Sequence, residues 1–206
     1  MMNSVNQFFT ILELILVFPQ LLLFYLTTQK QIIIADVQKW VSIFELKSSS
    51  NLINLLTLIS RNQEFRNLYY YRISKGNLLA RIFMKIIKIF YPECSTLFID
   101  PSCNIGEGLF IQHGFSTIIM ADMGKDCWVN QQVSIGYKDK TGRPKIGNNV
   151  RITAGAKVLG NINLGNNVTV GANAVVTKNV PDNCVVVGVP AYIIKRDGLK
   201  VKEDLV

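Results

Sequence analysis

The feature that most constrains the fold is a six-residue repeat in the second half of the chain. An aliphatic residue recurs every six positions, with Thr117 off type, in the run Ile99, Ile105, Ile111, Thr117, Met123, Val129 and Ile135. An unbroken second run consists of Ile146, Ile152, Val158, Leu164, Val170 and Val176. A unit of six residues is too short to contain a helix, so each unit is predicted to be one short strand and a turn.

A second set of mostly small or apolar residues follows the first at a spacing of four. It consists of Cys103, Leu109, Phe115, Ala121, Cys127, Val133, Val150, Ala156, Ile162, Val168, Ala174 and Val180. Two inward positions in every six residues predict that three units close one triangular coil of about eighteen residues. Stacked coils pair strand on strand about 4.8 Å apart, so we predict a mainly β domain, a parallel β-helix, over residues 93–206.

The repeat is interrupted between Ile135 and Ile146, where the spacing exceeds six by five residues. Gly142 and Pro144 lie in this segment. We therefore predict an extruded loop at residues 137–145. A long loop on a rigid scaffold usually carries function.

The first 92 residues lack this repeat and are predicted to form an α-helical N-terminal region. Residues 8–26 are apolar over about the length of a membrane span, but Glu13, Gln20 and a central Pro19 interrupt them. We favour two short apolar helices that lie against other subunits or in a membrane interface. A single spanning helix is the alternative.

A basic amphipathic helix is predicted just before the repeat begins. Its apolar residues recur at helical spacing and are Leu79, Ile82, Phe83, Ile86, Ile87 and Phe90. Arg81, Lys85 and Lys88 lie on a neighbouring face. Two roles fit this pattern, namely packing on a core with solvated lysines and docking on an anionic membrane surface.

The charge of the chain limits the classes of molecule that it is expected to bind. The net charge of +8 favours anionic partners such as anionic lipid or a phosphorylated cofactor. The basic residues are scattered and no nucleic-acid-binding motif is present, so no nucleic-acid partner is predicted.

The four cysteines lack metal-ligand spacing and the single histidine cannot complete an ordinary zinc site, so no metal is predicted. The N-terminus lacks a basic segment and a cleavage site, which predicts a cytoplasmic location, with the inner face of the cell membrane as an option.

Several segments resemble the serine acetyltransferase branch of the hexapeptide-repeat acyltransferases. They are residues 146–150, 153–161, 170–172 and 188–191, and residues 111–114 resemble the segment that holds the catalytic histidine of that branch. The resemblance covers residues 97–196. It implies a left-handed β-helix, a homotrimer, and acetyl-CoA bound in a groove between neighbouring subunits.

The chain departs from the serine enzymes at three positions. Gln112 stands where they carry aspartate, Arg143 aligns with their second histidine, and Phe98 falls on their orienting aspartate. The groups expected to hold the amino and carboxylate groups of serine are therefore largely replaced. The short, apolar N-terminal half is more similar to the acetyltransferases of capsule, exopolysaccharide and O-antigen pathways. We therefore predict a sugar hydroxyl as the acceptor, with serine as the alternative.

Residues one coil apart stack, so a column can be followed through the single histidine. Its predicted members are His113, Gln131, Ala154, Ala172 and, if the register persists, Pro190. Side chains become smaller after the first two positions. This leaves a shallow track for the pantetheine arm of acetyl-CoA, which is the predicted acyl donor.

A second predicted column pairs Lys178 with Arg196, and Lys195 adjoins it. This basic group is assigned to the phosphates of coenzyme A, with a solvated edge as the alternative. Gly136 and Tyr137 are assigned to the same cofactor. Backbone amides in that region, or the amide of Gln131, are candidates to stabilise the oxyanion.

His113 is the predicted catalytic base, because acetyl transfer to an alcohol requires removal of a proton and imidazoles titrate near neutral pH. Direct transfer is preferred because no cysteine or serine lies in a nucleophile motif beside it. The side chains predicted to contact the acceptor are Gln112, Gln131 and Arg143, and those that could orient the imidazole are Asp100 and Asp122. A non-catalytic structural or membrane-docking β-helix is the alternative from another class.

Overall fold

A computed structural model describes residues 17–46 and 50–205 and divides the chain into two compact units, residues 1–94 and 95–206. The division falls two residues after the expected boundary at 92/93. Of the apolar stretch at 8–26, residues 8–16 lie outside the described part. Within residues 17–46 and 50–205, no helix has the length and apolar character needed to cross a membrane.

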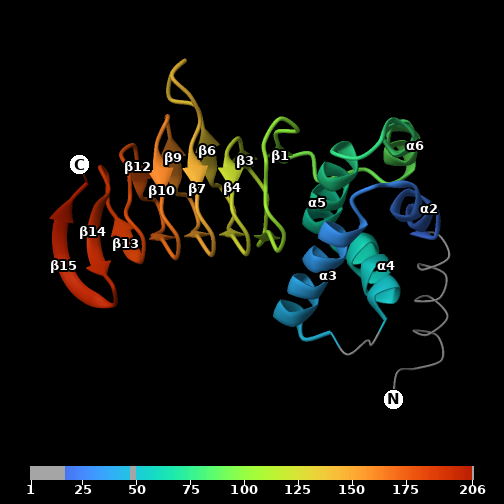
Figure 1. Cartoon of the computed structure of the whole chain (residues 1–206), viewed down its shortest axis with the longest axis horizontal. Coiled ribbons are helices and arrows are strands. Elements are labelled where there is room, and N and C mark those ends of the chain that lie inside the picture. Colours follow the sequence, from blue (N-terminus) through green and yellow to red (C-terminus); the bar gives the residue numbers. More distant parts are fainter. Residues whose placement is uncertain (1–16, 47–49, 206) are drawn as a thin grey trace. The chain divides into compact units, whose positions relative to one another are not determined.

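The described part of the N-terminal unit is helical (Figure 1). Its helices are α2 (Pro19–Leu26), α3 (Lys30–Phe44), α4 (Asn51–Arg61), α5 (Gln63–Ser74) and α6 (Leu78–Phe90). Helix α5 packs against α3, α4 and α6, and buries Phe65 against Trp40 of α3. Pro19 begins α2 instead of kinking a helix, because the first turn needs no N–H from that residue.

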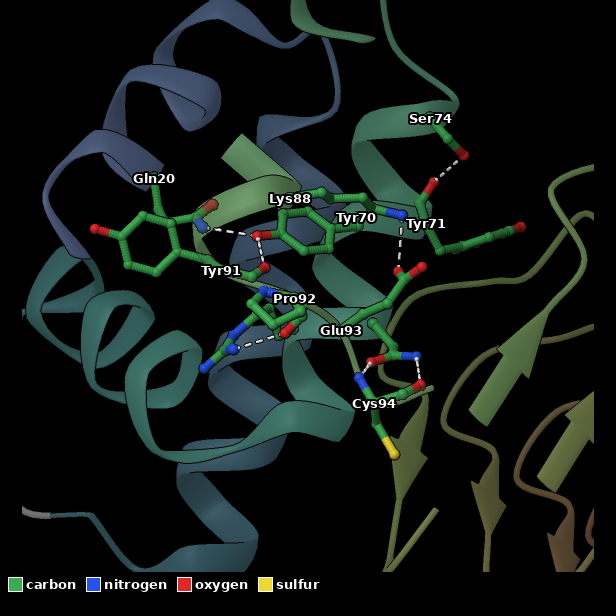
Figure 2. Close-up of polar contacts among 11 residues, drawn as sticks. Gln20, Tyr70, Tyr71, Ser74, Lys88, Tyr91, Pro92, Glu93 and Cys94 are labelled. Atoms are coloured by element: carbon green, nitrogen blue, oxygen red, sulfur yellow. Dashed lines mark hydrogen bonds and ion pairs between the residues drawn. The ribbon is translucent and has the colours of Figure 1, made fainter. Parts of the chain in front are cut away.

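Buried polar side chains tie α5 to its neighbours. Arg72 and Asp36 of α3 form an ion pair with N–O distances of 2.8 and 3.2 Å, and both side chains are 2% exposed. In Figure 2, the amide of Gln20 donates to the hydroxyl of Tyr70, which donates to the carbonyl of Tyr91. Burial raises the pKa of Tyr70 to about 12, so this hydroxyl remains a donor at neutral pH.

The C-terminal unit is a β-helix with three sheets of parallel strands. The first sheet contains β1 (Leu97–Ile99), β3 (Thr117–Ile119), β6 (Ser134–Gly136), β9 (Lys157–Leu159) and β12 (Val175–Val176). The second sheet contains β4 (Asp122–Met123), β7 (Lys145–Ile146) and β10 (Asn163–Leu164). The third sheet contains β2 (Phe110–Ile111), β5 (Trp128–Val129), β8 (Arg151–Ile152), β11 (Thr169–Val170) and β13 (Cys184–Val187).

The third sheet ends in an antiparallel hairpin of β14 (Tyr192–Arg196) and β15 (Leu199–Asp204), and β14 pairs with β13. The hairpin is the curved pair of strands at the C-terminal end in Figure 1. The six-residue repeat does not continue into it.

The second run of the repeat gives the core as predicted. Its aliphatic side chains are at most 5% exposed, and Ile146 pairs with Leu164 as Ile152 pairs with Val170. The extruded loop is also present, because β6 ends at Gly136 and β7 begins at Lys145. Figure 1 shows this loop projecting from the stacked coils.

One coil of the first run differs from the prediction. Ile111 pairs with Val129, but Ile118 pairs with Ser134. The turn between β2 and β3 therefore contains two residues more than the turn between β5 and β6 in the next coil. Phe115 is therefore 48% exposed, and its prediction as an inward residue is wrong. Buried Thr117, which aligns with Val133, takes that inward position, and buried Ile119, which pairs with Ile135, takes the position predicted for Thr117.

Glycines stack at the corner between the second and third sheets. They are Gly106, Gly124, Gly147 and Gly165. A Cβ at Gly147 would lie 2.8 Å from the carbonyl carbon of Gly165, and a Cβ at Gly124 would lie 2.8 Å from that of Gly147. The coils therefore approach so closely at this corner that glycine is required.

Candidate functional site

Most of the predicted site residues lie at two different corners of the triangular coil. The histidine corner joins the third sheet to the first and contains residues 112–116, 130–133, 153–156 and 171–174. The loop corner joins the first sheet to the second and contains residues 137–144, 160–162 and 177–179.

His113 is the second residue after β2, lies in the enlarged turn of the histidine corner, and is exposed. Its backbone has φ +53°, and its carbonyl accepts a hydrogen bond of 2.8 Å from the Phe115 N–H. Gln132 at the next turn and Asn149 at another corner also have positive φ. The left-handed backbone at His113 is thus a property of these tight turns, and its imidazole is accessible to a substrate.

The side chain of Gln112 is fixed by two donors from the coil below. Its Oε1 accepts hydrogen bonds of 3.2 Å from the Trp128 Nε1 and from the Asn130 Nδ2. The Trp128 ring packs edge-on against Phe110, and the Arg151 guanidinium lies 4.7 Å from the ring centroid. The amide oxygen of Gln112 therefore points toward β5, and its NH2 group points away from these two donors.

Trp128 and Asn130 were not among the predicted site residues. Each lies one coil after a residue of the His113 segment. Trp128 pairs with Phe110. Asn130 occupies the position after Val129 that Gln112 occupies after Ile111. The spacing of eighteen that located Gln131 would also have located them. They surround the residue that precedes His113, so they belong to the candidate site.

The predicted column below His113 is formed in part. Strand pairing of Val129 with Ile152, and of Ile152 with Val170, places Gln131, Ala154 and Ala172 in register. The Gln131 side-chain oxygen is buried and has no hydrogen-bond partner within the described part of the chain. Ala154 is partly exposed and Ala172 is exposed, and the track for the pantetheine arm stays a prediction.

Pro190 does not continue this column. Val170 pairs with Val186, so the last coil is shorter and Gly188 follows Ala172 in register. Pro190 instead lines a cavity of about 290 Å³ together with Lys178, Tyr192 and other residues near the C-terminus. The structure thus brings Pro190 and Lys178 together, away from the histidine corner.

The predicted basic column of Lys178 and Arg196 is wrong. Arg196 lies on β14, which runs antiparallel to β13, and its guanidinium forms an ion pair with Glu203. The Lys178 Nζ donates to the carbonyl of Leu205 at 2.9 Å. Lys195 is exposed on β14 and lies opposite Lys200 in register.

Arg143 fastens the extruded loop to the first coil. Its guanidinium donates to the Ser102 hydroxyl at 2.7 Å and to the Asp122 carboxylate at 2.9 Å. Within the loop, hydrogen bonds from Thr141 lower the pKa of Asp139. Because the loop leaves the loop corner, Arg143 lies at a different corner of the chain from Gln112 and Gln131, with which it was predicted to contact the acceptor.

The two carboxylates proposed to orient the imidazole have other partners. Asp122 accepts from Arg143 and from the Asn104 N–H at 2.7 Å. Asp100 accepts from the Ser102 N–H at 2.8 Å. Both stabilise turns of the first coils, and their proposed contact with His113 stays a prediction.

Gly136 and Tyr137 lie at the start of the loop corner. Gly136 is buried at the end of β6, and its carbonyl accepts from the Gly160 N–H at 2.9 Å. Tyr137 is 48% exposed. Across residues 17–46 and 50–205, no three or more His, Cys, Asp or Glu side chains form a group that could hold a metal ion.

Comparison with known proteins agrees with this geometry. Residues 143–178 match the family described as "Bacterial transferase hexapeptide (six repeats)". Over these residues the repeat is similar to that of this family, and the predicted left-handed β-helix is confirmed.

The chain is also similar to serine acetyltransferases. It is 44% identical to the protein of Synechococcus elongatus over 50% of this chain and 44% of the relative, and 39% identical to that of Staphylococcus xylosus over 62% and 59%. The crystal structure of the Vibrio cholerae serine acetyltransferase superposes with a TM-score of 0.65 at 26% identity, covering 84% of this chain and 68% of that one. A serine acetyltransferase in complex with CoA superposes with a TM-score of 0.62 at 26% identity, covering 81% and 70%. The chain thus spans less than two thirds of the length of these two curated relatives.

Proposed function

We propose that this chain is an acetyl-CoA-dependent O-acetyltransferase with His113 as its general base. The observation that carries the proposal is the exposed imidazole in the enlarged turn, which heads a column whose next members after Gln131 are Ala154 and Ala172. The relatives named serine acetyltransferase, one of them solved with CoA, support the choice of acyl donor. The small side chains leave room for an extended pantetheine arm along the coils.

The reaction requires one proton transfer on each side of a tetrahedral intermediate. The imidazole of His113 takes the proton of the acceptor hydroxyl as its oxygen attacks the thioester carbonyl. Collapse of the intermediate breaks the carbon–sulfur bond, and the departing thiolate receives the proton from the imidazolium. The products are an acetyl ester and free coenzyme A, and direct transfer needs no acyl-enzyme.

A homotrimer would complete the site. His113 lies at the histidine corner and Arg143, Gly136 and Tyr137 lie at the loop corner, so a site that uses both sets needs two chains. The outward side of the first sheet is also suited to self-association, because Phe98, which pairs with Ile118, and Ile118 itself are 49% and 44% exposed. Burial of such side chains between copies stabilises an oligomer.

L-serine is the acceptor that the names of the relatives favour. A sugar hydroxyl is the second candidate, and Gln112 favours it. Because Trp128 and Asn130 hold the amide oxygen, Gln112 presents an NH2 group to a ligand. An NH2 donor binds a hydroxyl or ring oxygen but not the ammonium group of serine.

The decisive experiment measures release of the coenzyme A thiol from acetyl-CoA by the full chain. Acceptors are L-serine, free sugars and nucleotide sugars. We expect His113→Asn, which suits a left-handed turn, to reduce turnover by about 100-fold or more. Gln132→Asn is the matched control, since Gln132 is an exposed turn residue with φ +58° in the next coil. Retained turnover in His113→Asn would refute the mechanism.

The acceptor is tested in the same assay with Gln112→Asp. A carboxylate at this position should raise the rate with L-serine and lower the rate with the preferred sugar. If the unmodified chain is faster with L-serine than with any sugar, the activity is that of a serine acetyltransferase. If calorimetry detects no binding of CoA, the chain is a non-catalytic β-helix. The cytoplasmic location stays a prediction.

A further inference from the structure

Helix α6 turns an apolar side outward. Ala80, Met84 and Ile87 are buried against the N-terminal unit. The opposite side consists of large apolar residues that are 49–75% exposed, namely Leu78, Leu79, Ile82, Ile86, Ile89 and Phe90. A helix at an ordinary protein surface shows polar residues on this side, so an outward apolar stripe indicates a binding surface. The simple core-packing role considered for this helix is therefore insufficient.

Helix α2 extends the apolar surface. It packs against α6 (Figure 1). Phe18, the residue before α2, and Leu22 and Tyr25 within it recur at helical spacing and are 64%, 47% and 56% exposed. We call the exposed apolar residues of the two helices the α2–α6 face. A cluster of this kind is larger than the isolated apolar residues that are normal at a protein surface.

The charges beside the α2–α6 face are basic. Arg81 and Lys85 are exposed along one edge of the apolar stripe of α6, and neither α2 nor α6 contains Asp or Glu. Lys30 lies 5.9 Å from the Tyr25 ring centroid. Lys88 of α6, in contrast, forms an ion pair of 2.8 Å with Glu93 (Figure 2).

We propose that the α2–α6 face docks on an anionic lipid surface. An apolar stripe with lysine and arginine along its edge fits the boundary between acyl chains and anionic headgroups, where the helix lies in the plane of the membrane. At 13 residues, α6 would extend about 20 Å along that plane. A second copy is a poorer partner, because each face would bring its own Arg81 and Lys85 and no acid from α2 or α6 to pair with them.

The experiment is flotation of the full chain with vesicles of phosphatidylcholine alone or with about one third phosphatidylglycerol. We expect binding to the anionic vesicles that weakens as salt is raised. Ile89→Asp should abolish it. Leu199→Asp is the matched control, because Leu199 of β15 is 73% exposed and Ile89 is 75% exposed, and it should leave binding unchanged.

The charge requirement is tested separately. Arg81→Gln and Lys85→Gln should each weaken binding to anionic vesicles about fivefold, whereas Lys200→Gln on β15 should not. The proposal is overturned if the chain does not float with anionic vesicles, or if Ile89→Asp floats as well as the unmodified chain. The proposal is also overturned if the chain does not bind vesicles but self-associates as its concentration rises, and Ile89→Asp abolishes that self-association. The α2–α6 face would then bind a second copy. Because thiol release is measured without lipid, failure here leaves the proposed acetyl transfer intact.

Discussion

Replacement of Gly147 by alanine tests whether the coils stack as closely as the structure requires. The added Cβ would lie 2.8 Å from both the carbonyl carbon and the oxygen of Gly165, and 2.9 Å from the Asn166 nitrogen. All three are backbone atoms of the next coil, and the Gly147 N–H donates to the Leu164 carbonyl at 2.8 Å across the same gap. The coil therefore has to move by several tenths of an ångström and stretch its hydrogen bonds.

Overpacking of this kind costs about 1–3 kcal/mol, and a weakened hydrogen bond adds about 1 kcal/mol. Alanine also lowers the entropy of the unfolded chain, which offsets about 0.4–1 kcal/mol. We expect a net loss of about 2–3 kcal/mol in the free energy of unfolding. For a chain of this length, that corresponds to a fall of about 4–12 °C in Tm.

Thermal unfolding followed by circular dichroism measures this change. Gly136→Ala is the matched control, because its Cβ would meet Met120 at an ordinary 3.4 Å, and its Tm should change by less than about 3 °C. If the Tm of Gly147→Ala differs from that of the unmodified chain by less than about 3 °C, the corner has room for a methyl group. Glycine would then not be required at this corner.

Three further predictions concern buried groups. Asp36→Asn leaves the Arg72 guanidinium buried without its counter-charge, so urea denaturation should show a loss of about 3–5 kcal/mol. Burial raises the pKa of the Cys103 thiol to about 11, so mass spectrometry after iodoacetamide treatment at pH 8 should find Cys94, which is partly exposed, labelled well before Cys103. Tyr70 ionises near pH 10 in the unfolded chain and near 12 in the folded protein, so the free energy of unfolding should fall by about 2 kcal/mol as pH rises through that interval, and less in Tyr70→Phe.

Periodicity predicts the β-helix because every unit of the second run obeys one local rule. An aliphatic residue at each sixth position fills the interior, and the next coil repeats it, so sequence spacing and strand register coincide from Ile146 to Val176. The rule fails where a turn changes length. The turn that contains His113 is two residues longer, and the next turn, between β3 and β4, is two residues shorter than its counterpart in the first coil. The strict count therefore resumes at Met123 and conceals the outward position of Phe115.

The site was predictable only where neighbouring coils have equal length. Gln131, Ala154 and Ala172 follow from the spacing of eighteen and the loop correction, whereas Pro190 and Arg196 follow a shorter coil and an antiparallel hairpin that no repeat indicates. The separation of His113 from Arg143 depends on which corner each turn occupies. Sequence spacing gives the column of a residue but says nothing of contacts between corners.

The C-terminal hairpin also bears on aggregation. A stack of parallel coils ends in a row of unpaired N–H and C=O groups, which can template addition of another chain and so seed a fibre. On the third sheet, β14 runs antiparallel to β13, and the edge strand β15 pairs with β14 and carries Lys200, Lys202, Glu203 and Asp204. An edge strand that carries these charges is a poor template for a further coil. The same hairpin that removes Arg196 from the predicted cofactor column therefore protects this face of the β-helix from end-to-end polymerisation.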